Sequence, residues 1–366
     1  MVTPFYYPTT IGGTESLIES ITMKLNEHRI HTDIMALNYV TRLKTAWNEK
    51  NEIINGLNIV KVPTAILPRP TFFINHFPAH FRRKMKQYDI VHFHNDTDLS
   101  FPFFSYGLRM PKIFHCHCLD TTYYHYKRNP IARQIFLRSA DIFIALSRFL
   151  SGMLSDLGVP KENIRIVPNG VDVNRFREGT GEKNENLLLF VGRLDPKKGI
   201  RVLLQSLKHL NTPVKLVMIG PSSTYKEYSR GIVKLIDDVG KKTMHTVTYL
   251  GRVAPQELVR WYQKASILVL PSISESFPMV NIESLACGTP VVASNVGAVS
   301  EVVRDHENGI LVPPGNPIKL AEALQYLLDN EDTRLKFGKQ GVKWIVENFS
   351  SEVTITRLID IYRSLL

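Results

Sequence analysis

Cysteine is scarce in this sequence. The 366 residues contain three cysteines, Cys116, Cys118 and Cys287. The number is odd and each cysteine falls in an apolar segment, whereas a disulfide framework needs cysteines in pairs. We therefore expect no disulfide framework and a reducing compartment.

Long apolar runs are also missing. A membrane-spanning helix needs about 20 consecutive apolar residues, and no run in the sequence reaches that length. The first residues, Met1-Val-Thr-Pro-Phe5, carry neither the basic nor the apolar region of a signal peptide. These absences predict a cytoplasmic protein.

Acidic residues are outnumbered by basic ones. Asp and Glu total 34 against 45 Lys and Arg, which gives a net charge of +11. A strong positive charge indicates an anionic partner. Nucleic acid is one such partner, but the sequence contains no recognised nucleic-acid-binding module, and we expect none to bind.

Apolar runs of strand length alternate with helical patterns along the chain. The strands that this pattern predicts are Thr32–Leu37, Ile90–Phe93, Lys112–Cys116, Ile142–Ala145, Leu187–Val191, Val214–Ile219, Val247–Leu250, Ile267–Leu270 and Leu311–Val312. Such alternation is typical of doubly wound α/β sheets, and the length allows two of them. The apolar pattern lapses between 172 and 186. We therefore predict an N-terminal domain over 1–174, a second domain over 175–348 and a C-terminal helix over 349–366.

One segment combines two glutamates with a strand end, a loop and a helix start. Ile267–Leu270 is a short apolar run, Pro278 suits the first turn of a helix, and Gly288 ends that helix. Glu275 therefore falls in the loop at the carboxyl end of a strand, and Glu283 falls one to two turns into the helix. Ligands of open α/β sheets bind at that edge, beside helix N-termini. Two carboxylates next to groups that attract anions suit a ligand with hydroxyls and phosphate, such as a sugar nucleotide.

The segment resembles the paired-glutamate signature of the family-4 glycosyltransferases, which are retaining enzymes of the GT-B fold. That family typically reads Pro-Ser-x-x-Glu-x-Phe, then Glu, then Ala-x-Gly-x-Pro-Val-Val-Ala. The matching residues of this chain are Pro271, Ser272, Glu275, Phe277, Glu283, Ala286, Gly288, Pro290, Val291, Val292 and Ala293. The resemblance implies two Rossmann-like α/β domains with the donor bound in the cleft between them, and a last helix that crosses back to the first domain.

A second motif runs from Leu187 to Gly199, where an apolar strand opens into a loop with Gly, Arg and Lys. A guanidinium offers forked donors and an ammonium a compact charge, so Arg193 and Lys198 can neutralise a departing diphosphate. The loop resembles the diphosphate clamp of the same family, Gly-Arg-Leu followed by Lys-Gly. The alternative is a solvated basic loop.

Two smaller resemblances lie in the N-terminal half. Gly12 and Gly13 precede a helical apolar pattern, where they let a ligand approach the backbone at a helix start. The family has a double glycine there, and the alternative is an ordinary strand-to-helix turn. His117 follows the strand at 112–116 and aligns with a family histidine near the reacting sugar. The alternative is a core histidine.

The residue types suggest two metal sites, but the spacing and position of these residues along the chain argue against both. The residues that look like zinc ligands are His92, His94, His115, His117, Cys116 and Cys118. Alternation along a strand, however, sends 115 and 117 to one face and 116 and 118 to the other. Asp96-Thr-Asp98 resembles the metal clamp of the other glycosyltransferase fold, but it lies in the wrong half of the chain. We therefore predict no obligatory metal or other cofactor, with Arg193 and Lys198 in the place of a divalent ion.

Aromatic and basic residues mix in the segment 72–86. If this segment is helical from Pro78, Phe81 and Met85 lie on one face near Phe77, and the basic residues surround the rest. Those basic residues are Arg82, Arg83, Lys84 and Lys86. The pattern suits peripheral contact with anionic lipid on the inner face of a membrane. The alternative is a core-packed helix with a solvated basic face.

The resemblance implies transfer of a sugar, with retention, from a UDP, GDP or ADP sugar to a hydroxyl of a glycan, a small molecule or a lipid-linked acceptor. It implies that Glu283 holds the ribose hydroxyls, that Glu275 orients the sugar, and that His117 lies beside the anomeric centre. The backbone N–H groups that help to orient the sugar belong to Phe277, Met279 and Val280. Two alternatives stay open: a sugar-nucleotide epimerase or hydrolase of the same fold, and a non-catalytic protein that binds nucleotide sugars or nucleic acid.

Overall fold

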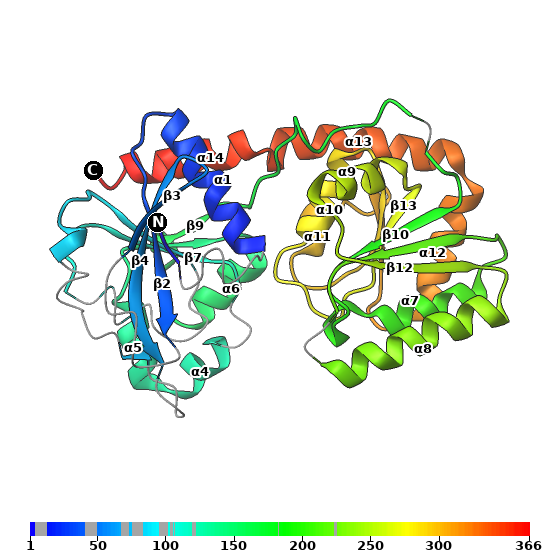
Figure 1. Cartoon of the computed structure of the whole chain (residues 1–366), viewed down its shortest axis with the longest axis horizontal. Coiled ribbons are helices and arrows are strands. Elements are labelled where there is room, and N and C mark those ends of the chain that lie inside the picture. Colours follow the sequence, from blue (N-terminus) through cyan, green and yellow to red (C-terminus); the bar gives the residue numbers. More distant parts are fainter. Residues whose placement is uncertain are drawn as a thin grey trace. The chain divides into compact units, whose positions relative to one another are not determined.

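The computed structural model describes residues 1–3, 13–40, 50–66, 73–74, 83–94, 102, 105, 107–118, 122–181, 183–222 and 225–366. The chain forms two compact units. Unit 1 comprises Met1–Asn169 and Thr354–Leu366, and unit 2 comprises Gly170–Val353. Each unit is a largely parallel sheet with helices packed on it (Figure 1).

The sheet of unit 1 has the strand order β3-β4-β2-β1-β6-β7-β8-β9, and β5 pairs with β4. Its strands are β1 (Val2–Thr3), β2 (Ile34–Val40), β3 (Lys50–Ile54), β4 (Leu57–Ile66), β5 (Phe73–Ile74), β6 (Val91–His94), β7 (Lys112–Cys116), β8 (Ile142–Ala145) and β9 (Ile164–Ile166). Neighbouring strands are parallel, except that β3 and β5 run antiparallel to β4. The helices are α1 (Gly13–Glu27), α4 (Thr122–Arg128), α5 (Pro130–Leu137), α6 (Arg148–Asp156), the short 3-10 helix η1 (Lys161–Asn163) and α14 (Ser351–Arg363).

The C-terminal helix α14 packs beside α1 on one face of this sheet (Figure 1). Ile355 and Leu358 of α14 share a buried apolar cluster with Ile21 and Leu25 of α1. The expected crossing of the last helix to the first domain is therefore confirmed. The opposite face is covered by α4 and α5. Phe136 of α5 meets Phe114 of β7 edge to face, and Tyr126 of α4 stacks on Phe136.

Unit 2 is a parallel sheet of strand order β12-β11-β10-β13-β14-β15. Its strands are β10 (Leu187–Val191), β11 (Lys215–Ile219), β12 (Thr246–Gly251), β13 (Ile267–Leu270), β14 (Val291–Ser294) and β15 (Gly309–Val312). Its helices are η2 (Pro196–Lys198), α7 (Ile200–Ser206), η3 (Leu207–His209), α8 (Lys226–Lys242), α9 (Pro255–Lys264), α10 (Met279–Ala286), α11 (Val299–Val302), α12 (Pro317–Asp329) and α13 (Glu331–Phe349).

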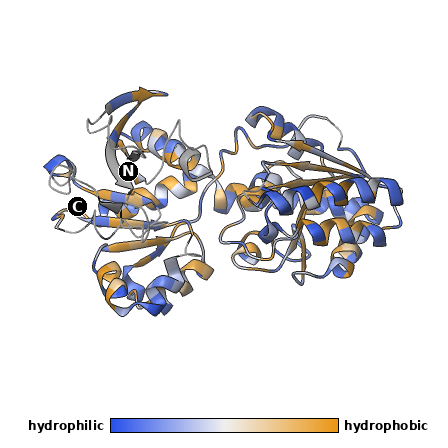
Figure 2. Ribbon diagram, turned by 60° about the horizontal axis from the view of Figure 1, so that its bottom comes forward, coloured by the Kyte–Doolittle hydropathy of each residue, from blue (hydrophilic) through white to orange (hydrophobic). Residues whose placement is uncertain are grey.

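Burial explains why the strands could be recognised as apolar runs. Every residue of β10 and β13 is buried, as is usual for parallel strands covered on both faces. Figure 2 shows the same pattern, with hydrophobic strands and helices whose outward faces are hydrophilic. The predicted runs at 112–116, 142–145, 187–191 and 267–270 form β7, β8, β10 and β13 with the same bounds. The predicted fold class, two Rossmann-like α/β domains, is confirmed.

Candidate active site

The strand order of unit 2 reverses direction between β10 and β13. From β10 the chain adds β11 and β12 on one side, and β13 then begins the other side with β14 and β15. Loops that leave such a switch point diverge and form a crevice at the carboxyl ends of the strands, where ligands of this fold class bind. The two predicted motifs follow β10 and β13, so both reach this point.

The loop after β10 contacts the loop after β13 directly. The Ile273 N–H donates a hydrogen bond to the Lys197 carbonyl over 2.7 Å. Gly199 adopts φ +64°, and a Cβ atom at this position would lie 1.8 Å from the Pro271 carbonyl oxygen. Only glycine combines that backbone conformation with so close an approach. The Lys-Gly step of the motif therefore brings Lys198 against the neighbouring loop.

Lys198 and Glu275 form an ion pair at the switch point. The Lys198 Nζ donates to Glu275 Oε2 over 2.6 Å, and Ser272 Oγ donates to the same oxygen over 3.2 Å. The side chains are 25% and 12% exposed, so solvent reaches the pair only in part. The structure thus joins two residues for which the sequence predicted separate roles.

Arg193 lies in the same loop as Lys198 but is held differently. Its side chain is exposed, and it forms no hydrogen bond or ion pair with any residue that the structure describes. The backbone carbonyl of Arg193 accepts a hydrogen bond from the Asp195 N–H over 2.7 Å. The guanidinium is therefore available to an anion in the crevice.

Helix α10 begins at the other side of the crevice. Pro278 precedes it without a side-chain cap, and uncapped N–H groups at a helix start attract anions. Met279 and Val280 are half-buried, while Phe277 is buried and contacts the ring of Phe349. The Met279 N–H already donates to the Phe277 carbonyl over 3.1 Å. Of the three predicted backbone donors, the one at Met279 is thus occupied within the chain.

Glu283 lies just over one turn into α10 and has a partner that the sequence did not reveal. Tyr262 of α9 donates its hydroxyl to Glu283 Oε2 over 2.6 Å. Burial raises the pKa of the Glu283 carboxyl to about 7, while Tyr262 and the positive charge of Arg175 oppose that shift. Glu283 is nevertheless partly exposed and can reach a ligand. Tyr262 was missed because a tyrosine in an amphipathic helix reads as core.

His117 belongs to unit 1, just past the end of β7. It is 8% exposed, and its Nε2 lies 2.9 Å from His94 Nδ1. Burial lowers the pKa of His117 to about 3, so the imidazole is neutral near pH 7. Gly13 opens α1, and Gly12 lies outside the described residues. A neutral His117 can donate or accept a hydrogen bond but carries no charge.

Family comparisons cover both units. The family described as "Glycosyltransferase Family 4" matches residues 11–175, and the family described as "Glycosyl transferases group 1" matches residues 172–344. The chain is a family-4, group 1 glycosyltransferase. Among its relatives, an uncharacterised glycosyltransferase of Methanocaldococcus jannaschii is 29% identical over 98% of this chain and 96% of that protein. A D-inositol 3-phosphate glycosyltransferase of Corynebacterium urealyticum is 33% identical over 56% of this chain and 52% of its own length.

Solved structures share the fold of this glycosyltransferase. Sucrose-phosphate synthase from Thermosynechococcus elongatus has a TM-score of 0.77 at 21% identity, covering 100% of this chain and 98% of that one. Anabaena HepE in complex with UDP has a TM-score of 0.80 at 17% identity, covering all of both chains. At such identities the likeness establishes the GT-B fold alone.

The basic segment of the glycosyltransferase is described only in part. Phe77, Phe81 and Arg82 lie outside the described residues, as do Asp96 and Asp98. The remaining basic residues are Arg83 and Lys86, which are exposed, and Lys84, which is half-buried next to the buried Met85. Among the described residues, no helix is long and apolar enough to cross a bilayer. Contact with a membrane surface stays a prediction.

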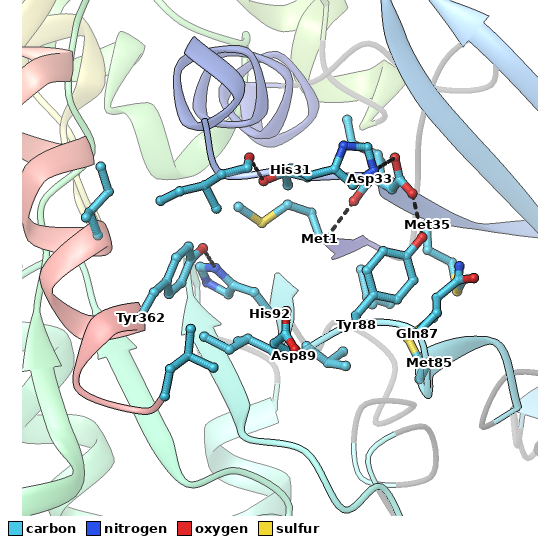
Figure 3. Close-up of a pocket in the computed structure, with 18 of the residues that line it drawn as sticks. Met1, His31, Asp33, Met35, Met85, Gln87, Tyr88, Asp89, His92 and Tyr362 are labelled. Atoms are coloured by element: carbon cyan, nitrogen blue, oxygen red, sulfur yellow. Dashed lines mark hydrogen bonds and ion pairs between the residues drawn. The ribbon is translucent and has the colours of Figure 1, made fainter. Parts of the chain in front are cut away.

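A cavity of about 650 Å³ lies at the amino ends of strands β2 and β6 of the unit 1 sheet (Figure 3). Its lining includes residues before β2 and β6, among them Asp33 and Tyr88, together with Tyr362 of α14. Tyr88 donates its hydroxyl to Asp33 Oδ2 over 2.5 Å. These residues precede their strands, whereas ligands of open α/β sheets bind where strands end. We therefore do not assign this cavity to the sugar nucleotide.

Proposed function

We propose that this glycosyltransferase moves a sugar, with retention, from a nucleoside-diphosphate sugar to a hydroxyl acceptor. The observation that carries the proposal is the Lys198–Glu275 ion pair at the switch point of unit 2. A fixed ammonium at this position is suited to the charge that develops on a leaving diphosphate. The UDP and UDP-glucose complexes of HepE make UDP sugars the first donors to test.

Binding of the donor uses groups that the structure holds in place. Glu283, braced by Tyr262, accepts hydrogen bonds from the ribose hydroxyls. The uncapped start of α10 faces the phosphates or the sugar, and Glu275 orients the sugar. Arg193 is exposed in the adjacent loop and contacts the diphosphate from solvent. With these roles the donor binds on unit 2.

The proposed reaction needs no protein nucleophile. The bond from the anomeric carbon to the phosphate oxygen breaks, and the acceptor oxygen bonds to that carbon on the same face. The acceptor proton passes to the departing phosphate, so atoms and charge balance. Lys198 and Arg193 stabilise the leaving group in the role that a divalent ion plays elsewhere. The family resemblance implies that His117, which is neutral, lies beside the anomeric centre.

The first test is release of nucleoside diphosphate by the purified protein. We expect release from a UDP, GDP or ADP sugar only when a hydroxyl acceptor is present, and we expect it to continue in excess EDTA. A thermal-shift screen selects the donor, because a ligand at about 100 times its Kd stabilises by about 2.7 kcal/mol. Release without acceptor would instead indicate a hydrolase, and full loss in EDTA with recovery on adding manganese would contradict metal independence.

The affinity for the donor should depend on the charge of Glu283. The carboxyl has a pKa of about 7 in the free protein, and only its ionised form accepts hydrogen bonds from two ribose hydroxyls. As the pH falls through this value, a smaller fraction of the Glu283 carboxyl is ionised. The Kd for the UDP sugar should therefore rise about tenfold between about pH 8 and about pH 6. Isothermal titration calorimetry at several pH values measures this. Glu283→Gln should bind weakly at every pH, and Glu257→Gln, in the exposed part of α9, is the matched control.

A further inference from the structure

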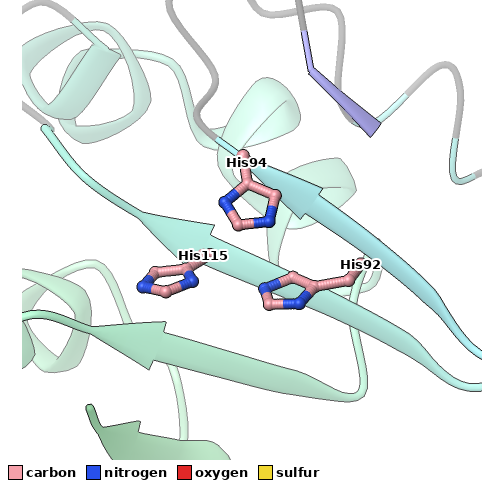
Figure 4. Close-up of side chains that lie close together, drawn as sticks. All are labelled: His92, His94 and His115. Atoms are coloured by element: carbon pink, nitrogen blue, oxygen red, sulfur yellow. The ribbon is translucent and has the colours of Figure 1, made fainter. Parts of the chain in front are cut away.

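Four histidines gather on one face of the unit 1 sheet. His92 and His94 belong to β6, His115 to β7, and His117 follows β7. The parallel register pairs His94 with His115, so the alternate residues of both strands point to the same side. Ring centroids lie 4.3 Å apart for His92–His94 and for His115–His117, and 5.2 Å apart for His92–His115. Figure 4 shows His92, His94 and His115 side by side on the two strands.

The three strand histidines are buried, and part of their hydrogen-bonding capacity is unused. His92 is 3% exposed, and His94 and His115 are fully buried. His92 Nε2 and both ring nitrogens of His115 have no hydrogen-bond partner among the described residues. A buried polar atom without a partner costs free energy, so in the folded protein each such atom is expected to meet an ordered water or an ion. Here the unpaired atoms are all imidazole nitrogens that converge on one place.

We propose that His92, His94 and His115 bind a divalent transition-metal ion of the zinc type. One nitrogen from each residue lies within 4.8 Å of the others. Tetrahedral zinc with bonds of about 2.0–2.1 Å holds its ligand nitrogens about 3.3 Å apart, so small side-chain rotations close the site. Imidazoles suit zinc, copper, nickel or iron, whereas magnesium, calcium and manganese prefer oxygen ligands, and the cluster contains no carboxylate.

The surroundings resemble the supporting shell of a metal site. His92 Nδ1 lies 2.6 Å from the hydroxyl of Tyr362, an arrangement that orients the ring and leaves Nε2 for an ion. His94 is oriented in the same way by His117, at 2.9 Å. The Met1 sulfur lies 3.0 Å from His94 Nε2, so a thioether or a water completes the fourth position. His92 also lines the cavity of Figure 3, which gives an ion a way in.

The ion would tie β6 to β7 and, through Tyr362, to α14. It lies in unit 1 and does not take part in the clamp formed by Lys198 and Arg193 in unit 2. We assign the ion a structural role, which goes beyond the proposed function, although its ligand His94 also contacts His117. Metal content and thermal stability, rather than turnover, are the readouts that test it.

The experiment uses the untagged chain, stripped with a chelator, loaded with Zn²⁺ and desalted. We expect about one zinc per chain by elemental analysis of the desalted protein. With free Zn²⁺ added back to about 100 times Kd, we expect a rise in Tm of roughly 5 to 10 °C. Cobalt loading should give the intense visible absorption of tetrahedral Co²⁺. Wild-type protein that retains no zinc and shows no shift in Tm would overturn the proposal.

His115→Leu is the decisive variant. It removes both unpaired nitrogens of His115 and puts an apolar side chain in their place, so the metal-free variant should be at least as stable as the metal-free wild type. It should bind no zinc and show no zinc-dependent shift in Tm. If His115→Leu does not fold, His115→Phe serves the same purpose, because it replaces the imidazole with an aromatic ring that has no nitrogen. His209→Ala, at an exposed histidine in unit 2, is the matched control and should bind as the wild type does. Equal zinc content in His115→Leu and wild type would assign the metal elsewhere and overturn the proposal.

Discussion

Replacing Lys198 with alanine is expected to lower kcat by about 10²- to 10³-fold, with a much smaller change in KM for the donor. The ammonium is held at 2.6 Å from Glu275 and is partly shielded from solvent. An ammonium that stabilises the charge of a leaving group acts mainly in the transition state, because that charge is absent from the bound substrate and develops as the bond breaks. Steady-state kinetics with the donor varied at saturating acceptor measures the effect. Lys197→Ala, one residue away and exposed, should retain near wild-type kcat.

The loss has a second possible origin, because Lys198→Ala also strips Glu275 of its partner. Glu275→Gln and the double variant separate the two. If Lys198 acts only by holding Glu275, its removal should cost nothing more once Glu275 is glutamine. If it stabilises the leaving group, kcat should fall in both backgrounds. Wild-type kcat in Lys198→Ala, or an equal loss in Lys197→Ala, would contradict the assignment.

The two glycosyltransferase motifs contact each other around this ion pair. Gly199 lets the loop after β10 approach the Pro271 carbonyl, and the Lys197–Ile273 backbone bond fixes the two loops. Lys198 is therefore oriented before any ligand arrives, and little reorganisation is needed during the reaction. Under the proposed function, a bound diphosphate would give Lys198 an anion on each side. In this proposal Glu275 holds the ammonium in place.

The sequence predicted the parallel strands well for a physical reason. Strands buried on both faces read as short apolar runs, and those runs matched β7, β8, β10 and β13. The edge of the unit 1 sheet was missed. There β3 and β4 form a hairpin around Asn55 and Gly56, with φ of 51° and 77°. Asn-Gly between two strands is a strong hairpin signal, but the flanking strands alternate with polar residues and were not recognised.

Residue types at the candidate site were predictable, but their contacts were not. Lys198 and Glu275 are 77 positions apart, and only the fold decides that they pair. The contact of Tyr262 with Glu283 was likewise not predictable, because it depends on how α9 and α10 pack. Alternation along one strand separates Cys116 from the histidines, but it does not show which residues of the neighbouring strand lie beside them. The register between β6 and β7 is what brings His94 against His115, and the sequence does not contain it.

Gly297→Ala should test how closely the site depends on backbone packing. Gly297 follows β14 with φ +53°, and a Cβ atom would lie 1.8 Å from the carbonyl oxygen of Glu275. The left-handed conformation alone costs about 1–2 kcal/mol with a side chain, and relieving the overlap costs about 1–3 kcal/mol more. We therefore expect a loss of about 2–5 kcal/mol in the free energy of unfolding, measured by urea denaturation.

Gly315→Ala separates backbone strain from overlap. Gly315 has φ +72°, but a Cβ atom at this position would meet nothing within 4 Å, so only the strain of about 1–2 kcal/mol applies. Its kcat should equal that of the wild type. Gly297→Ala should also lower kcat, even at temperatures where the variant is fully folded. Displacing the Glu275 backbone relieves the overlap, and that movement carries the partner of Lys198 with it. Equal losses of stability in the two variants, with kcat unchanged in both, would show that the Glu275 loop yields without cost and that its position does not set the rate.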